Sequence, residues 1–286
     1  MKNKILLFAT LLSITFFIGC NNEPVNDAAP LNAISVDEAV LNTEIDATVD
    51  DVSFIAEDQF DIQKCVAAKT SAPIKSMLPI CATITSVLTG ETWTRTIDFG
   101  AQGCALPNGN ILKGKMIISF SKNFTTPIRT ITYKLEGFYH NDKLIEGSKT
   151  ITHELKTSVL LATIHPVTTH LIDMKITFPD GKIYTRIGTR VREMVEGFAT
   201  IGNWEDNVFN VWGSHTTTFP GGSIHSNLIK TPLLLKMSCK MPFPVSGIVE
   251  IVKNDAKATL DYGNGDCDKL ATMTINGVSK EIVLRK

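Results

Sequence analysis

The 286-residue sequence lacks long hydrophobic runs, a large net charge and complete catalytic motifs. Only residues 5–18 approach the length of a membrane span, which excludes a polytopic membrane protein. Hydrophobic residues make up 43% of the chain and charged residues 20%, which excludes disorder along its whole length. The formal net charge of −1 gives no direct sign of a charge-driven partner.

The small net charge hides an uneven distribution of charge along the sequence. Residues 1–20 contain two lysines and no acidic residue, whereas residues 21–63 contain eleven Asp and Glu and no Lys or Arg. Residues 64–286 contain 26 Lys and Arg against 18 Asp and Glu. An acidic leader of charge −11 therefore precedes a body of charge +8, and electrostatic partners stay open.

Motifs for hydrolytic, nucleotide and metal chemistry are incomplete or missing. His153 and Glu154 begin like a zinc-protease motif, but Thr157 stands where the second histidine is required. Residues 109–115 approach a phosphate-binding loop, but Met116 replaces the Ser or Thr that binds magnesium. The chain has no Gly-x-Ser-x-Gly sequence and no Cys-x₂-Cys pair. We therefore expect no metal and no cofactor, and favour a non-enzymatic role over a metal-dependent hydrolase.

The first residues have the pattern of an export signal. Lys2 and Lys4 precede the apolar residues 5–18. Fourteen helical residues rise about 21 Å, which is less than the ~30 Å thickness of a hydrocarbon core. Residues 1–19 are therefore predicted to be a cleaved signal peptide rather than a permanent span.

The end of this signal is similar to the lipobox of bacterial lipoproteins. Gly19 precedes Cys20, and Phe17 stands where that pattern more often has Leu. The resemblance implies cleavage before Cys20 and attachment of acyl chains such as palmitate to it, so that a membrane is a partner. Several acyl chains on one residue give stable anchoring. Asn21, rather than Asp, follows the cysteine, which favours the outer membrane of the cell envelope.

The acidic leader divides into a tether over residues 20–34 and a helical segment over residues 35–64. The tether is polar and contains two prolines. Ser35 and Glu38 have the spacing of a helix capping box, and apolar residues recur behind them at helical intervals. Three roles stay open for the helical leader: a solvated spacer, a helix packed on the basic body, or a calcium-binding segment.

Residues 65–286 predict a β-rich body. Ile, Val and Thr are frequent from about residue 80, and Gly- and Asn-containing turns interrupt alternating runs such as 172–178. No helical period recurs between these runs, so a parallel βαβ arrangement is disfavoured. The predicted fold class is mainly β, with antiparallel sheets arranged as a sandwich or an open curved sheet and a short N-terminal helical leader.

An internal repeat marks both ends of the body, at residues 81–104 and 239–267. An apolar residue, Asp, an aromatic residue and Gly are followed after three positions by Cys, once at residues 97–104 and once at residues 260–267. The shared Asp and Gly fit turn chemistry better than a calcium site, because the further acids of the second copy are missing from the first.

Cysteine usage permits disulfides in an exported chain. The candidates are Cys81, Cys104, Cys239 and Cys267, with a second cysteine upstream in each copy of the repeat. Pairing within each copy and pairing between copies are both open, and Cys65 is left over.

The repeat segments, including Leu260-Asp-Tyr-Gly-Asn-Gly-Asp-Cys267, resemble a group of uncharacterised Gram-negative bacterial lipoproteins. The similarity spans residues from about 80 to 286. It implies an exported, β-rich lipoprotein and no particular activity, so it assigns no functional residue.

A basic strand is the main candidate for a binding face. Lys182, Arg186, Arg190 and Arg192 share one face by the two-residue period, and a two-residue turn would place Lys175 beside Arg186. The face predicts a contact with phosphate head groups, acidic glycans or a protein partner, including the chain's own leader. Nucleic acid is not expected in this compartment. The alternatives are a solvated outer face, and a lipid or lipoprotein carrier whose curved sheet encloses an apolar cavity.

Overall fold

The computed structural model describes residues 33–69 and 74–285, which belong to one compact unit. The signal segment 1–19, Cys20 and nearly all of the tether lie outside the described residues. Among the described residues, no helix is long and apolar enough to cross a membrane.

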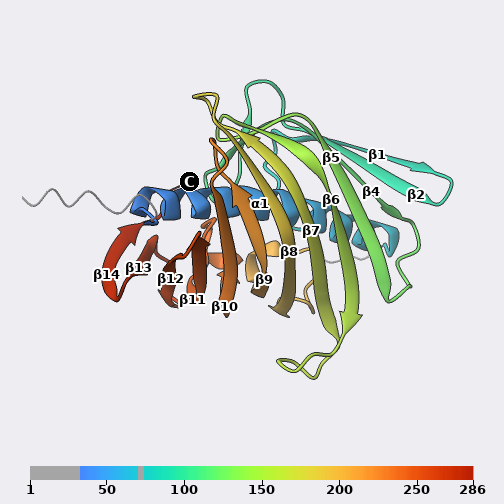
Figure 1. Cartoon of the computed structure of the whole chain (residues 1–286). Helices are drawn as coiled ribbons and strands as arrows, with labels where there is room; N and C mark the ends of the chain where they lie inside the picture. The colour runs from blue at the N-terminus through green and yellow to red at the C-terminus, as the bar shows by residue number, and fades with distance from the viewer. Residues whose placement is uncertain (1–32, 70–73, 286) are drawn as a thin grey trace, which may run out of the picture. The chain divides into compact units, whose positions relative to one another are not determined.

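One antiparallel sheet makes up most of this unit and confirms the predicted fold class, with the open curved sheet rather than the sandwich. Each strand pairs with the next along the chain, except that β2 pairs with β4 and the short β3, which lies off this path, pairs only with β4. Figure 1 shows the sheet curving around the helix α1. The strands are β1 (Thr83–Thr89), β2 (Thr92–Asp98), β3 (Cys104–Ala105), β4 (Ile111–Ser121), β5 (Ile128–His140), β6 (Lys143–Lys156), β7 (His165–Thr177), β8 (Ile183–Glu196), β9 (Val208–Thr218), β10 (Ile224–Lys236), β11 (Ser246–Lys253), β12 (Ala256–Asn264), β13 (Leu270–Ile275) and β14 (Val278–Val283).

The acidic leader forms one long helix, α1 (Val36–Ala67), instead of a short one. Ser35 and Glu38 form the capping box that the sequence predicts, because each side chain bonds the other residue's backbone N–H. The helix lies across the concave side of the sheet (Figure 1). The leader is therefore a helix packed on the body, the second of the three roles left open above.

Apolar side chains of α1 form the centre of the hydrophobic core. Ile45, Val49, Val52 and Ile55 are fully buried and belong to the same cluster as inward residues of the sheet. Phe60 contacts Phe120 edge to face, with 5.2 Å between the ring centroids. The packing of α1 on the sheet buries apolar surface of both the helix and the sheet. The sheet therefore depends on the helix for its hydrophobic core.

The two repeat copies have the same turn chemistry. Asp98 accepts a hydrogen bond from the Gly100 N–H at 2.8 Å, and Asp261 accepts one from the Gly263 N–H at 2.9 Å. Both glycines have a positive φ, +70° and +87°, a region that favours residues without a Cβ. The shared Asp and Gly therefore serve the turns, as the sequence comparison of the two copies indicates.

The orientation of β8 is the reverse of what its alternation suggests. Arg186, Arg190 and Arg192 lie on the buried concave side, with exposed fractions of 0%, 2% and 2%. Ile183 and Ile187 lie on the convex side and are exposed. The apolar residues of an alternating strand normally mark the core side. Here the acidic helix covers the arginines, and this inverts the pattern.

The prediction that Lys175 lies beside Arg186 is wrong, because the pairing of β7 with β8 is shifted by one residue. Thr177 pairs with Ile183, so the β7–β8 connection has five residues rather than two. Lys175 consequently pairs with Thr185, not with Arg186. A one-residue change of register moves a side chain to the other face of a sheet.

Candidate functional site

The strongest concentration of charge lies between α1 and the concave side of the sheet. We call Arg186, Arg190 and Arg192 the arginine row. Carboxylates of α1 contact every member of the row. Asp46 pairs with Arg186 and Arg190, Asp50 with Arg190 at 3.0 Å and Arg192 at 3.2 Å, and Glu57 with Arg192 at 3.3 Å.

Helical spacing explains how three acids reach one strand. Asp46 and Asp50 are four residues apart, so they lie on the same face of α1. The arginine row alternates along β8 and presents its guanidinium groups to that face. The Arg192 guanidinium also lies 3.7 Å from the centre of the Phe54 ring, a cation–π contact that shields it from water.

The arginine row keeps Asp50 and Glu57 of α1 ionised despite their burial. Burial by itself raises the pKa of Asp50, but Arg190 and Arg192 outweigh it and hold the pKa below its usual value. Burial likewise opposes ionisation of Glu57, while Arg192 and His170 bring its pKa down to about 2. These carboxylates and guanidinium groups therefore neutralise each other inside the protein.

Further pairs extend this contact along the length of α1. Glu38 pairs with Lys253 at 2.7 Å and Glu44 with Lys143 at 2.6 Å. Asp51 lies 2.9 Å from the Nε2 atom of His140. The acidic leader and the basic body thus neutralise each other by direct contact, and the leader is the partner that the arginine row meets in this structure.

Two residues of the predicted basic face do not join the arginine row. Lys175 pairs with Glu146 at 2.7 Å and Lys182 with Asp180 at 2.7 Å, and all four side chains are largely exposed. Surface pairs of this kind contribute little to stability. The predicted face is therefore divided: three arginines lie inside and two lysines on the surface.

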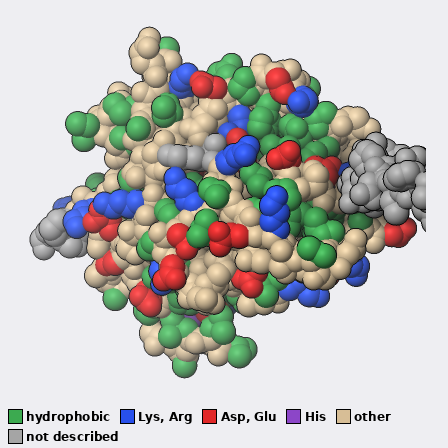
Figure 2. Space-filling view, turned by 90° about the vertical axis from the view of Figure 1, so that its left-hand side faces the viewer, with side chains coloured by type: hydrophobic (Ala, Val, Ile, Leu, Met, Phe, Trp, Pro, Cys, Tyr) green, Lys and Arg blue, Asp and Glu red, His purple; other side chains and the backbone are tan. Residues whose placement is uncertain are grey.

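All six histidines are buried, with exposed fractions of 4% or less. Figure 2 shows side chains of both charge signs intermixed on one face of the molecule, with histidine almost hidden from view. Burial lowers the pKa of His153 to about 4, and burial together with Lys149 lowers that of His170 to about 3. Both imidazoles are therefore neutral near pH 7.

The cysteines pair within each copy of the repeat. Cys81 is bonded to Cys104 and Cys239 to Cys267, which settles the connectivity left open by the sequence. Cys65 is a buried free thiol. Cys20 lies outside the described residues. No group of three or more His, Cys, Asp or Glu among the described residues could hold a metal ion.

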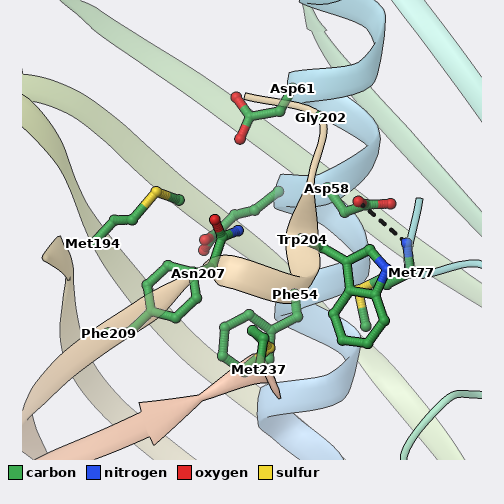
Figure 3. Close-up of a pocket in the computed structure, with 11 residues that line it drawn as sticks. Phe54, Asp58, Asp61, Met77, Met194, Gly202, Trp204, Asn207, Phe209 and Met237 are labelled. Carbon is green, nitrogen blue, oxygen red and sulfur yellow. Dashed lines mark hydrogen bonds between the residues drawn. The ribbon is translucent and has the colours of Figure 1, made fainter. Parts of the chain in front are cut away.

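Small cavities follow the second half of α1, beneath the connection between β8 and β9. One of them has a volume of about 30 Å³ and is lined by residues from Phe54 to Asp61 of α1. Figure 3 shows Met194, Trp204 and Met237 in its wall. The Asp58 carboxylate in its wall accepts a hydrogen bond from the Met77 N–H (Figure 3). This cavity carries apolar walls on the sheet side and acids on the helix side.

A larger cavity of about 200 Å³ adjoins it, and we call it the Asp61 cavity. It shares Asp61, Met194, Gly202 and Asn207 with the smaller one. Its remaining lining residues are Lys64, His153, Leu155, Ile164, His165, Pro166, Gly197, Phe198 and Ile201.

The polar groups of the Asp61 cavity are hidden in the sequence. Asp61 is one of eleven acids in the leader, and His153 stands out only as part of an incomplete zinc motif. Asp61 and His153 line the same cavity because α1 crosses β6 at this point. This is a tertiary contact, which the spacing of residues in the sequence does not predict.

No known protein family, curated protein or solved structure matches this chain.

Proposed function

We propose that the protein is an exported lipoprotein, attached to the outer membrane of the cell envelope through acyl chains on Cys20, with a non-enzymatic binding or structural role. The observation that carries this proposal is the pair of disulfides, Cys81–Cys104 and Cys239–Cys267. Disulfides persist in oxidising compartments and are rare in the cytosol. They agree with the export signal and lipobox pattern of residues 1–20.

The position of α1 fits an anchored protein. The tether that follows Cys20 leads directly into α1, which is the central element of the core. The membrane attachment is thereby linked to the most buried element of the body rather than to a peripheral one. The resemblance to Gram-negative lipoproteins supports the same role.

The buried charges favour a structural or binding role over that of a carrier. A lipid carrier of this shape would need an open apolar trough, and here α1 fills the concave side of the sheet. An external anion such as a phosphate head group or acidic glycan would have to displace α1 from the arginine row. We therefore propose that the arginine row holds the leader in place, and that outside partners bind elsewhere on the body.

Substitution of the lipidated cysteine tests this proposal. The variant Cys20→Ser removes the acceptor for acyl chains, while Cys65→Ser removes the other cysteine that is outside the disulfides. We expect the wild type and Cys65→Ser to fractionate with the outer membrane and to carry acyl chains by mass spectrometry. Cys20→Ser should lose both properties. Normal processing and unchanged membrane retention of Cys20→Ser would contradict the proposal.

A further inference from the structure

We propose that the Asp61 cavity is a binding site for a small organic amine, with the cationic nitrogen at Asp61 and His153 and an apolar body against the sheet. This inference goes beyond the proposed function, because it concerns a ligand site of the folded body and does not require the lipid anchor.

The size of the Asp61 cavity suits a ligand of about one ring. Its volume is about 200 Å³. An engineered apolar cavity of about 150 Å³ holds benzene in another protein. The space is therefore large enough for an aromatic or short aliphatic amine, but not for a lipid.

Asp61 has no partner of its own in this cavity. Within the described part of the chain it accepts no hydrogen bond and forms no ion pair. The neighbouring Asp58 differs, because Ser76, Gln59 and the Met77 N–H all donate to its carboxylate. Figure 3 shows the Asp61 carboxylate extending from α1 toward the β8–β9 connection. A half-buried carboxylate without a hydrogen-bond or ion-pair partner favours a cationic or strongly hydrogen-bonding ligand.

His153 supplies a second polar contact. Its side chain is 4% exposed, and its Nδ1 atom has no hydrogen-bond partner among the described residues. Burial keeps the imidazole neutral at pH 7, so it does not repel a cation. His165, on the same lining, is already bonded to Glu193 through Nε2 and to the Thr163 carbonyl through Nδ1. Asp61 and His153 are thus two polar groups of the lining with capacity for a ligand.

Charge and shape select an amine over an anion. An anionic ligand would face the Asp61 carboxylate at close range. Lys64 is the one cation on the lining; its charge and that of Arg129 oppose the effect of burial on the pKa of Asp61, but neither basic group forms an ion pair with that carboxylate. Most of the remaining wall is apolar, and the adaptable Met194 and the ring of Phe198 belong to it, where they can contact a hydrocarbon body.

Calorimetric titration of the full chain with benzylamine, benzyl alcohol and benzoate tests the site, because the three probes share one ring and differ in the head group. We expect saturable binding of one benzylamine per chain, binding of benzyl alcohol weaker by about tenfold, and no saturable binding of benzoate.

Two variants locate the binding. Asp61→Asn should weaken benzylamine binding by about tenfold or more. The matched control Asp37→Asn removes an exposed acid from the first turn of the same helix and should bind like the wild type. Ile201→Trp, which fills the cavity and leaves every charged residue of the lining in place, should abolish binding.

Three results would overturn the proposal. They are the absence of saturable benzylamine binding at millimolar concentration, equal affinity of the wild type and Asp61→Asn, and benzoate binding as tight as that of benzylamine. Unfolding curves of each variant show that it is folded before titration. The result for Cys20→Ser has no bearing on these outcomes, so failure of the anchor proposal and failure of this one are distinguishable.

Discussion

Four buried or half-buried acids of α1 fall into two groups whose pKa values shift in opposite directions. Asp50 and Glu57 contact arginines of β8, which keep them ionised. Asp58 and Asp61 lie farther along the helix, and burial raises their pKa to about 6 and about 7. The first group stabilises the fold through paired charge. The second is held at a cost in stability, a pattern that often marks a binding site.

Neutralising Asp50 should destabilise the protein strongly. In Asp50→Asn, Arg190 and Arg192 lose their shared carboxylate while they stay buried. Breaking a buried pair from one side lowers the free energy of unfolding by about 3 kcal/mol or more. Urea unfolding monitored by circular dichroism measures this loss. The exposed Asp37→Asn is the control, and similar midpoints for the two variants would show that the pairs contribute nothing.

Neutralising Asp61 should have the opposite effect, and the effect should depend on pH. The pKa of this carboxyl rises from 3.8 in the unfolded chain to about 7 in the folded one. Between these pH values the folded state retains a proton that the unfolded state has released, so the free energy of unfolding falls as pH rises from about 4 to about 7.

Asn cannot ionise, so Asp61→Asn should be more stable than the wild type by ~2–4 kcal/mol at pH 8 and about equally stable at pH 4. Urea unfolding at the two pH values gives both differences. A stability gain that is the same at pH 4 and pH 8 would contradict the raised pKa.

At the scale of helices and strands, local sequence patterns predict those structural features that depend only on residues close together in the sequence. The capping box at Ser35, the alternation of β8 and the turn chemistry of Asp98 and Asp261 all follow from spacing and are present in the structure. The inward side of β8 could not be predicted in this way, because an acidic helix distant in sequence makes that side suitable for arginine.

The register of Lys175 and the Asp61 cavity depend on similarly distant features. A five-residue connection between β7 and β8 places Lys175 on the convex side. The cavity exists because the β8–β9 connection passes over α1 near Gly202. Neither a loop length nor a crossing point is encoded in residue spacing, so both were beyond sequence analysis.

The disulfide of the second repeat copy should stabilise the C-terminal end of the sheet. Cys239 and Cys267 are separated by 28 positions in the sequence, and the loop that they close includes β11 and β12. A crosslink over this distance stabilises the folded chain by about 3 kcal/mol in the chain-entropy treatment. The double variant Cys239→Ser with Cys267→Ser should lose that amount in thermal or urea unfolding, whereas unchanged stability would show that the sheet end needs no crosslink.

At the scale of the whole molecule, the nine acids of α1 and the basic body belong to one folded unit rather than to two parts with separate partners. The helix supplies the apolar centre of the core and most of the acids that pair with buried basic residues. The sheet curves around it (Figure 1). The central claim is that α1 is an integral part of the fold in solution.

Hydrogen exchange of the backbone amides of α1 tests this claim most directly. If α1 is the core of the sheet, amides from about Ile45 to Phe60 exchange only through global unfolding, with the same free energy as amides of β7, β8 and β9. Their protection should fall in parallel with that of the sheet in Asp50→Asn. Exchange of these amides at the rate of an exposed, solvated helix, while the sheet stays protected, would contradict the account.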